Sequence, residues 1–262
     1  MPRKPILSPT RIRTYLLCEV KYYHTYLNPL GKRYIRARRE YSFGSTMHAV
    51  LQHLHSAGGV EQVPVEQLQQ VMQQQWVQAG YETPEQVAEF QQMGALLLQQ
   101  YHQQQQQALQ QVPPERRPRL LMQERLLRMD MGLFALVGRV DRVDEHPDGT
   151  LEIIDYKSLR TQVTPEEVHD DLAMCCYQLL LKHYYPDRRV IATIVALQTG
   201  DFASASLSDE ELREFGEDIR LLGEEIIARD FEYIQPLRIP HCDECDFLPL
   251  CERIWQQQEM SG

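Results

Sequence analysis

Two neighbouring segments carry acidic and basic residues at spacings that suit metal-assisted hydrolysis. Asp155 and Lys157 lie two residues apart in Leu151–Ser158, a run typical of a β-strand, and therefore share one face of that strand. If the preceding strand folds back in a hairpin centred on Asp148, Asp141 lies opposite Asp155, with Cβ atoms about 4.5–5.5 Å apart. Facing carboxylates repel each other, and a divalent cation such as Mg²⁺ removes this repulsion while keeping room for phosphate oxygens.

Lys157 supplies the positive charge that such a centre needs beside the metal. Its ammonium group could neutralise charge that develops during a reaction or orient an attacking water. The alternative is an ordinary surface ion pair between Asp155 and Lys157 on an edge strand. A two-residue turn at Asp148-Gly149 would also place Asp141 and Asp155 on opposite faces, so the metal-site interpretation predicts an odd number of loop residues.

Four of the six cysteines have a spacing that suits a metal or cluster site. Cys242, Cys245 and Cys251 follow the pattern Cys-x2-Cys-x5-Cys, and three thiols leave a four-coordinate site one ligand short. Cys18, far upstream, is the candidate fourth ligand, and thiolates suit both zinc and iron–sulfur clusters. We expect these thiols to be reduced or metal-bound rather than paired in disulfides, because the sequence shows no export signal.

The hydrophobic pattern predicts a chain that contains both β-strands and α-helices. Strands are expected at 119–129, 133–144 and 151–157, as an antiparallel meander, and a buried strand at 189–197. Helices are expected at 8–28, 45–55, 165–184 and 208–229. The last of these helices opens with a capping box at Ser208.

A glutamine-rich stretch separates the first helices from the predicted strands. Residues 61–111 contain 20 Gln and five Glu but no Lys or Arg. Apolar residues recur there at helical spacing, which favours two or three helices over a disordered tract. We therefore interpret 60–117 as a Gln-rich helical insertion within a single domain that spans residues 1–262.

The positions of the charged residues along the chain determine whether nucleic acid is a plausible partner. The chain is 43% hydrophobic and 24% charged, as in soluble globular proteins, and its net charge of -10 would by itself disfavour nucleic acid. Residues 1–40, however, hold ten Lys or Arg and two Glu, a net +8, whereas 201–262 hold 16 acidic and five basic residues, a net -11. The basic segment, with its interleaved tyrosines, suits a polyanion, and a solvated helix face is the alternative.

Neither a membrane span nor an export signal is visible in the sequence. No apolar run approaches the roughly 18 residues that a membrane helix needs. The first residues have no long apolar stretch and no small-residue cleavage site. We therefore expect a cytoplasmic protein without a membrane partner.

The two acidic segments resemble a known nuclease pattern. Gly138–Asp144, a short turn and Ile153–Lys157 are similar to motifs II and III of the PD-(D/E)XK nuclease superfamily, most closely its RecB-like branch. Upstream, Gly44 and His48 resemble the Gly-x-x-x-His motif of that branch. Glu124 resembles its first-strand acid, for which a structural role is the alternative.

This resemblance implies an α/β fold with a restriction-endonuclease-like core, in which helices flank a central mixed sheet, and which hydrolyses DNA with Mg²⁺ or Mn²⁺. The implied metal ligands are His48, Asp141, Asp155 and the carbonyl of Tyr156. Lys157 is the implied catalytic lysine, acting with Asp141 and Asp155, and one or two ions would serve.

Residues 172–185 resemble the helix that carries a Gln-x-x-x-Tyr motif in the same branch, but the pattern is broken. Ala173 stands at the Gln position if Tyr177 is the Tyr, and Lys182 stands at the Tyr position if Gln178 is the Gln. Tyr177 is retained here as an expected DNA contact.

The cysteine pattern resembles that of iron–sulfur RecB-like nucleases, which include the AddB nuclease domain and the CRISPR-associated adaptation nucleases. It implies a [4Fe–4S] cluster that joins Cys18 to the C-terminal segment 236–255, with zinc as the alternative metal. Such a cluster would hold the basic first segment beside the nuclease core. The DNA contacts then expected from this segment are Arg11, Arg13, Lys21, Tyr22 and Arg36.

The sequence thus predicts a DNA exonuclease that acts on single-stranded or end-containing DNA in repair, recombination or CRISPR adaptation. No helicase motif is present, so a helicase or CRISPR adaptation proteins would be separate partner chains. One alternative is a non-catalytic DNA-binding or scaffolding subunit that keeps the fold and cluster. Another is a zinc-stapled structural protein with surface carboxylates.

Overall fold

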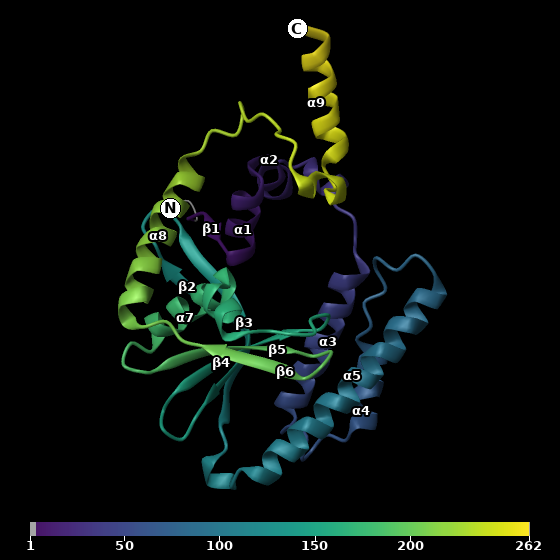
Figure 1. Ribbon diagram of the computed structural model, residues 1–262, viewed down its shortest axis with the longest axis vertical. Helices are drawn as coiled ribbons and strands as arrows, with labels where there is room; N and C mark the ends of the chain where they lie inside the picture. Colours follow the sequence, from purple (N-terminus) through teal and green to yellow (C-terminus); the bar gives the residue numbers. More distant parts are fainter. Residues whose placement is uncertain (1–3, 262) are drawn as a thin grey trace. The chain divides into compact units, whose positions relative to one another are not determined.

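The computed structural model describes residues 4–261, which form two compact units (Figure 1). The sheet unit consists of Ala37–Met129 and Val137–Gly216. The terminal unit consists of the described residues up to Arg36, Asp130–Leu136 and the described residues from Glu217 onward. All the candidate metal ligands belong to the sheet unit, and the four clustered cysteines belong to the terminal unit.

The described residues form a six-stranded mixed sheet, as the α/β prediction requires. The strands are β1 (Ile6–Leu7), β2 (Arg119–Asp130), β3 (Ala135–Glu145), β4 (Leu151–Lys157), β5 (Val190–Ala196) and β6 (Asp201–Ala205). The order is β1-β3-β4-β5-β6, and β2 also pairs with β3. The β3–β4 and β5–β6 pairs are antiparallel, whereas β1–β3 and β4–β5 are parallel. The short strands β1 and β6 were not predicted.

The hairpin of β3 and β4 has the register on which the metal-site interpretation depended. Val143 pairs with Ile153 and Asp144 pairs with Glu152, so the two strands fold back around position 148. The connecting loop holds residues 146–150, an odd number, as predicted. Continued past its last pair, this register brings Asp141 and Asp155 to opposing positions.

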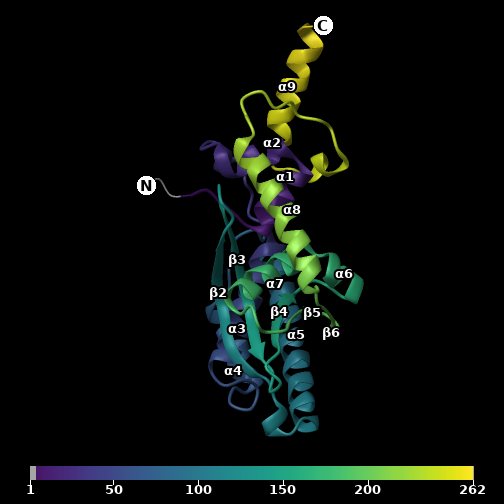
Figure 2. The same ribbon diagram turned by 90° about the vertical axis from the view of Figure 1, so that its left-hand side faces the viewer.

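Helices cover both faces of the strands in the sheet unit (Figure 2). Helices α3 (Arg39–Ser56), α4 (Val65–Gln74) and α5 (Pro84–Gln111) bury their apolar sides against the face that carries Ile154, Tyr156 and Val195. Helices α6 (Pro165–Asp170) and α7 (Leu172–Tyr184) pack on the opposite face, against Ala192, Ile194 and Ala203. The predicted helix at 165–184 is divided because the Asp171 carboxylate accepts from the amides of Ala173 and Met174 and starts a new helix.

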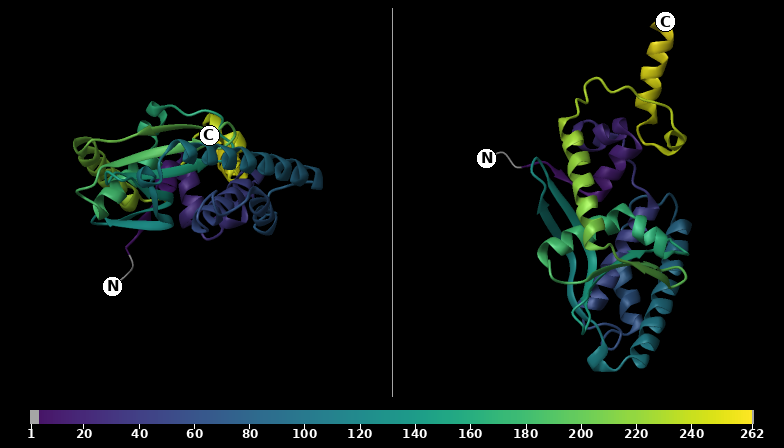
Figure 3. Two further views of the ribbon diagram at one scale, coloured as in Figure 1. Left: turned by 90° about the horizontal axis from the view of Figure 1, so that it is seen from below. Right: turned by 60° about the vertical axis from the view of Figure 1, so that its left-hand side comes forward.

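The Gln-rich stretch is helical, as its periodicity predicts, and its two helices α4 and α5 lie beside α3 (Figure 3). Helix α5 begins at a Thr83 cap, whose hydroxyl accepts from the Gln86 amide, and continues through the glutamine run 103–107. Its buried residues include Leu97, Leu98 and Tyr101, and the glutamines occupy largely solvent-facing positions. The polar composition therefore describes one side of an amphipathic helix.

The terminal unit contains α1 (Pro9–Leu17), α2 (Glu19–Tyr22), the C-terminal part of α8 (Asp209–Ala228) and α9 (Leu248–Ser261). The expected continuous helix at 8–28 is interrupted at Cys18, whose backbone is extended and whose Sγ caps the next helix by accepting from the Lys21 amide. A π-helical turn at Tyr23–Leu27 and a 3₁₀ turn at Pro240–Glu244 complete the segments that carry the cysteines. No helix in the described part of the chain is long and apolar enough to cross a membrane.

Candidate active site

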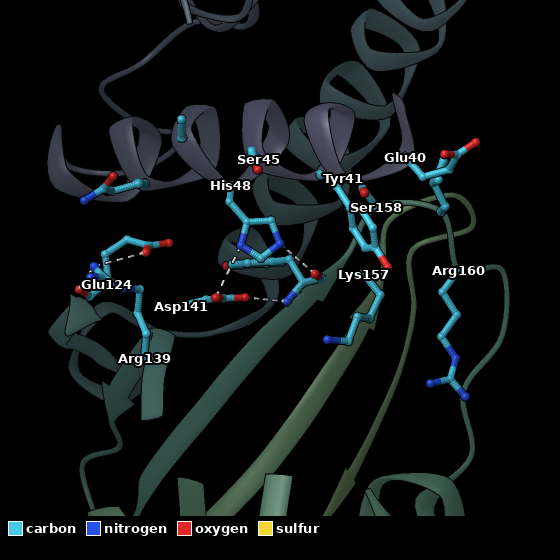
Figure 4. Close-up of a pocket in the computed structure, with 15 residues that line it drawn as sticks. Glu40, Tyr41, Ser45, His48, Glu124, Arg139, Asp141, Lys157, Ser158 and Arg160 are labelled. Carbon is cyan, nitrogen blue, oxygen red and sulfur yellow. Dashed lines mark hydrogen bonds and ion pairs between the residues drawn. The ribbon is translucent and has the colours of Figure 1, made fainter. Parts of the chain in front are cut away.

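A cleft of about 850 Å³ in the sheet unit brings together most of the residues singled out from the sequence (Figure 4). One wall is helix α3, which contributes Tyr41 and His48. The other is formed by β2, β3 and the end of β4, which contribute Glu124, Asp141 and Lys157. Helix α3 begins at Arg39 rather than at the predicted Ser45, and the extra turn is what adds Tyr41 to the wall.

Tyr156 joins Asp141 to His48 through its backbone. Its N–H donates to Asp141 Oδ2 at 3.0 Å, and its carbonyl oxygen lies 2.9 Å from His48 Nε2. Because a carbonyl only accepts, Nε2 carries a proton and His48 Nδ1 is the nitrogen available to a ligand. That Nδ1 atom lies 3.3 Å from Asp141 Oδ1. The burial of His48 acts to lower the pKa of its imidazole, but the hydrogen bond and charge of Asp141 outweigh burial and raise it.

Asp155 and Lys157 form the predicted same-face pair, with Lys157 Nζ 2.6 Å from Asp155 Oδ2. Burial raises the pKa of the Asp155 carboxyl, Lys157 opposes this, and the negative charge of Asp141 adds to it. Burial acts to lower the pKa of Lys157, but the charge and hydrogen bond of Asp155, together with the charges of Asp141 and Asp171, raise it overall, so Lys157 remains protonated. The ammonium group is partly exposed to the cleft and is held in place by a buried carboxylate.

Glu124 completes a set of three side chains that could hold one cation. One ligand atom each from His48, Glu124 and Asp141 lies within 4.8 Å of the others. Glu124 has a φ of 46°, in the left-handed region that residues other than glycine rarely adopt. Burial, followed by the negative charge of Asp141, raises the pKa of the Glu124 carboxyl. Two carboxylates and one imidazole so close together fit a divalent cation, and Asp155 lies next to this set.

The remaining cleft residues suit a nucleic-acid strand. Tyr41 is 73% exposed and projects from α3 into the cleft. Arg139 is exposed and donates to the Glu124 carbonyl at 3.0 Å, and Arg160 lines the cleft beyond Lys157. An exposed ring between cations can stack on a base while the cations contact phosphates.

Helix α7 carries Tyr177 and Gln178, the two candidates for the Gln-x-x-x-Tyr motif, and only Tyr177 lies near this site. Tyr177 is half-buried, and burial followed by the charges of Asp155 and Asp141 raises the pKa of its hydroxyl. Gln178 is fully buried, and its Oε1 accepts from the Leu207 amide at 3.0 Å. Gln178 therefore serves the packing of α7, and Tyr177 is the residue of this helix that lies near the acidic site.

The basic first segment, in the terminal unit, differs in part from the expectation. Tyr22 is only 3% exposed and packs against Tyr15, Tyr26 and Phe231, which corrects its assignment as a base-stacking residue. The Arg11 guanidinium lies 4.8 Å from the Tyr26 ring centroid. Lys21 Nζ lies 2.8 Å from His241 Nε2.

The side chains of Arg13 and Arg36 are exposed. These two arginines remain candidates for DNA contact from the first segment, together with the partly exposed Arg11 and Lys21. Such contacts neutralise phosphates without reading sequence.

The thiols of Cys18, Cys242, Cys245 and Cys251 gather in the terminal unit. Burial, followed by the charges of the other three cysteines, raises the pKa of the Cys251 thiol to about 11. Backbone N–H groups point at two of the sulfurs, from Lys21 to Cys18 and from Ile239 to Cys242, each at 3.4 Å. None of the cysteines forms a disulfide. Four convergent thiols with N–H···S contacts fit a thiolate-bound metal or cluster.

A mixed α/β sheet with Asp141 and the Asp155–Lys157 pair on adjacent strands defines the class of protein as an α/β nuclease. The sequence matches the PD-(D/E)XK nuclease superfamily over residues 6–252, and the chain belongs to that superfamily. Its substrate is therefore a nucleic acid. Among solved structures it is similar to the crystal structure of SSO0001, with 13% identity, a TM-score of 0.30 and coverage of 81% of this chain and 85% of that chain. No curated protein matches the sequence.

Several cleft residues were not identified as functional from the sequence. Glu124 was recognised only with a structural alternative, because its orientation depends on a left-handed backbone that nothing in the surrounding residues signals. Tyr41 and Arg139 were not singled out. Arg139 stands in the Gly138–Asp144 motif, and strand alternation places it on the same face of β3 as Asp141, so that signal was available.

Proposed function

We propose that this protein is a metal-dependent deoxyribonuclease of the RecB-like type that cleaves single-stranded or end-containing DNA as an exonuclease. The observation that carries the proposal is the Asp155–Lys157 pair, with its carboxylate buried and its ammonium open to the cleft, beside the cluster of His48, Glu124 and Asp141. Ordinary surface ion pairs do not have three further ligand groups converging on the same cleft. The reaction is hydrolysis, in which water attacks phosphorus and the P–O ester bond breaks.

The residues that would hold a Mg²⁺ or Mn²⁺ ion are His48, Asp141 and Glu124, together with Asp155 and the Tyr156 carbonyl. A bound divalent cation polarises a phosphoryl oxygen and lowers the pKa of bound water. Burial raises the pKa values of Glu124 and Asp155, and the negative charge of Asp141 raises both further, which supports a cation as the partner of these carboxylates. Carboxylate and carbonyl oxygens are the donors that Mg²⁺ and Mn²⁺ prefer.

Lys157 is the catalytic lysine in this proposal. Its ammonium group can donate to a phosphate oxygen or to the attacking water, and so stabilises the charge that develops at phosphorus. Asp155 fixes the direction of that ammonium group at 2.6 Å and keeps it protonated. We therefore expect Asp155 and Lys157 to determine the rate of cleavage and not the affinity for DNA.

The single-strand preference is supported by the shape and chemistry of the cleft. The exposed ring of Tyr41 offers a base-stacking surface that the paired bases of an intact duplex cannot reach. Arg139, Arg160 and Tyr177 are the expected contacts of the sheet unit with DNA. Arg11, Arg13, Lys21 and Arg36 are those of the terminal unit.

The four cysteines are proposed to hold a [4Fe–4S] cluster, with zinc as the competing assignment. The N–H···S contacts to Cys18 and Cys242 are of the kind that tune the reduction potential of such clusters. Iron and sulfide analysis of purified protein, with absorbance near 400 nm, separates the two. A colourless protein with one equivalent of zinc would remove the cluster from the proposal.

The competing function is a non-catalytic DNA-binding or scaffolding subunit. The broken Gln-x-x-x-Tyr pattern favours this alternative, because the Gln178 side chain accepts a hydrogen bond from the Leu207 amide. The intact Asp155–Lys157 pair favours the enzyme. Degradation of end-labelled single-stranded DNA in Mn²⁺ decides between them, with circular DNA of the same sequence testing the need for an end. Partners of the proposed pathway, a helicase or CRISPR adaptation proteins, would be separate cytoplasmic chains.

A further inference from the structure

Tyr156 faces in two directions at the end of β4. Its backbone N–H and carbonyl lie at the cleft, where the N–H donates to Asp141 and the carbonyl accepts from His48. Its ring lies on the opposite face of the strand, 3% exposed, among residues of α3 and α5. The orientation of this one residue therefore sets the relation between two of the candidate metal ligands.

The ring of Tyr156 is held by a polar network rather than by apolar packing alone. Tyr101 of α5 lies 3.1 Å from the Tyr156 hydroxyl, and His55 Nε2 of α3 lies 3.0 Å from it. Arg142 of β3 donates to the same oxygen at 3.2 Å. Arg142 is itself fixed by Asp144, to which its Nε donates at 2.7 Å. Residues from three other elements thus converge on a single hydroxyl group.

A buried charged network of this kind adds little net stability. Desolvating a buried pair such as Arg142 and Asp144, the latter 1% exposed, offsets most of its Coulombic gain, and apolar replacements often stabilise as well. A fully bonded buried network does restrict the geometry of the groups it holds. A cavity of about 10 Å³, near the lower limit for one water molecule, is lined both by this network and by Glu124 and Asp141. The network therefore directly adjoins the candidate ligands.

We propose that Tyr101 of the Gln-rich insertion is a positioning residue for metal binding. Through its hydroxyl contact with Tyr156, backed by His55 and Arg142, it fixes the Tyr156 peptide and so the separation of His48 and Asp141. The insertion then contributes to the active site from behind the cleft wall, without touching DNA or metal. This inference rests on the proposed function, in that these ligands hold a divalent cation.

The test is the substitution Tyr101→Phe, which removes the hydroxyl and keeps the ring. Mn²⁺ binding is measured by the electron paramagnetic resonance of free Mn²⁺, and thermal unfolding is recorded in parallel without metal. Loss of a group that orients ligands typically costs about 10–100-fold in affinity, and for this more remote contact we expect the Mn²⁺ Kd to rise about 3–10-fold. The kcat for DNA should fall by a similar factor with KM unchanged, because Tyr101 is buried away from the cleft.

The matched control is Tyr81→Phe in the same insertion. The Tyr81 hydroxyl has no hydrogen-bond partner among the described residues, so its loss should leave Mn²⁺ binding unchanged. A second variant, Tyr156→Phe, removes the hydroxyl on which the network converges and should weaken Mn²⁺ binding at least as much as Tyr101→Phe.

If Tyr101→Phe binds Mn²⁺ as tightly as the wild type, the inference is overturned, whatever happens to the unfolding temperature. The network would then have a structural role only. Weakened Mn²⁺ binding in a protein that cleaves no DNA would support the positioning role and contradict the proposed nuclease. The two claims can thus fail separately.

Discussion

Glu124 combines an unusual backbone conformation with a carboxylate that lies close to Asp141 and 3.9 Å from Arg139 Nη1. Its left-handed backbone, at a φ of 46°, carries a cost of about 1–3 kcal/mol that the surrounding structure must offset. The conformation turns its carboxylate toward Asp141, a like charge, and the pKa of Glu124 is raised by burial and by that charge. A cation between the two acids would convert repulsion into attraction.

The substitution Glu124→Gln should therefore have opposite effects on stability and on metal binding. Removing one of the clustered negative charges should raise the unfolding temperature of the metal-free protein by about 2–4 °C. The same change should weaken Mn²⁺ binding at least about 10-fold, as measured by calorimetric titration. Glu66→Gln, on the exposed surface of α4, is the control, and equal Mn²⁺ affinity in both variants would exclude Glu124 as a ligand.

Tyr41 is the residue at which substrate preference can be tested. Base–aromatic stacking is worth about 1–3 kcal/mol, so Tyr41→Ala should weaken binding of single-stranded DNA by about 5–100-fold, with a smaller effect on duplex. Fluorescence anisotropy in Ca²⁺ measures binding while limiting cleavage. Tyr233→Ala removes an equally exposed ring elsewhere and should change neither affinity. Equal losses for single-stranded and duplex DNA would remove the stacking role.

At the residue scale, a side chain's position could be predicted from the sequence when it depends on neighbours in the same strand or helix. Strand alternation predicts that Asp155 and Lys157 share one face of β4, and their 2.6 Å contact confirms this. The burial of Tyr22 was not predicted, because its ring packs on Phe231, more than 200 positions away in the chain. The role of Arg142 was equally invisible, since its partners His55 and Tyr156 lie on separate elements.

At the scale of elements, the contact of β3 with α7 is governed by Gly138. A Cβ atom at this position would lie 2.8 Å from the Tyr177 ring and from Leu180 Cδ1. Gly138→Ala should therefore lower the free energy of unfolding by about 1–3 kcal/mol, as expected when a packed core is overfilled, and should displace Tyr177. Urea denaturation measures the loss.

The control for this prediction is Gly216→Ala in α8. A Cβ atom there meets Leu179 Cδ1 only at 3.4 Å, and alanine favours a helix over glycine by about 1 kcal/mol. This variant should be as stable as the wild type or more so. If Gly138→Ala were as stable as the wild type, close packing of α7 on β3 would not explain why position 138 is a glycine.

The elements that were predicted are those whose pattern repeats over several residues. Strand β4 was found at Leu151–Lys157, as expected, and α5 was found despite its glutamines because its apolar residues keep helical spacing. Strands β1 and β6 were missed because two and five residues are too few to establish an alternation. The breaks at Cys18 and Asp171 were missed because each depends on a side chain that bonds the next helix's amides.

At the scale of the whole molecule, the proposed cluster belongs to the terminal unit and the proposed cleavage site to the sheet unit. Cys245→Ser should lower the iron content and destabilise the terminal unit, because thiolate ligation contributes to its folding. Calorimetry should then show an added transition at lower temperature, while the transition of the sheet unit persists.

Cys175→Ser is the matched control for the cluster. This thiol lies in the sheet unit and donates to the His169 carbonyl at 3.0 Å, a bond that serine can retain. Iron content and unfolding of the terminal unit should be unchanged. Unaltered iron in Cys245→Ser would contradict the four-cysteine site.

The central claim is that the Asp141, Asp155 and Lys157 site cleaves DNA with a divalent cation. The most direct measurement is degradation of end-labelled single-stranded DNA in Mn²⁺ by the wild type, Asp141→Ala and Lys157→Ala, with Lys4→Ala as a control in an exposed ion pair. We expect the wild type and Lys4→Ala to cleave, chelation to abolish cleavage, and each site variant to lose about 100-fold or more in rate while still binding DNA. Wild-type rates in Asp141→Ala and Lys157→Ala would contradict the account.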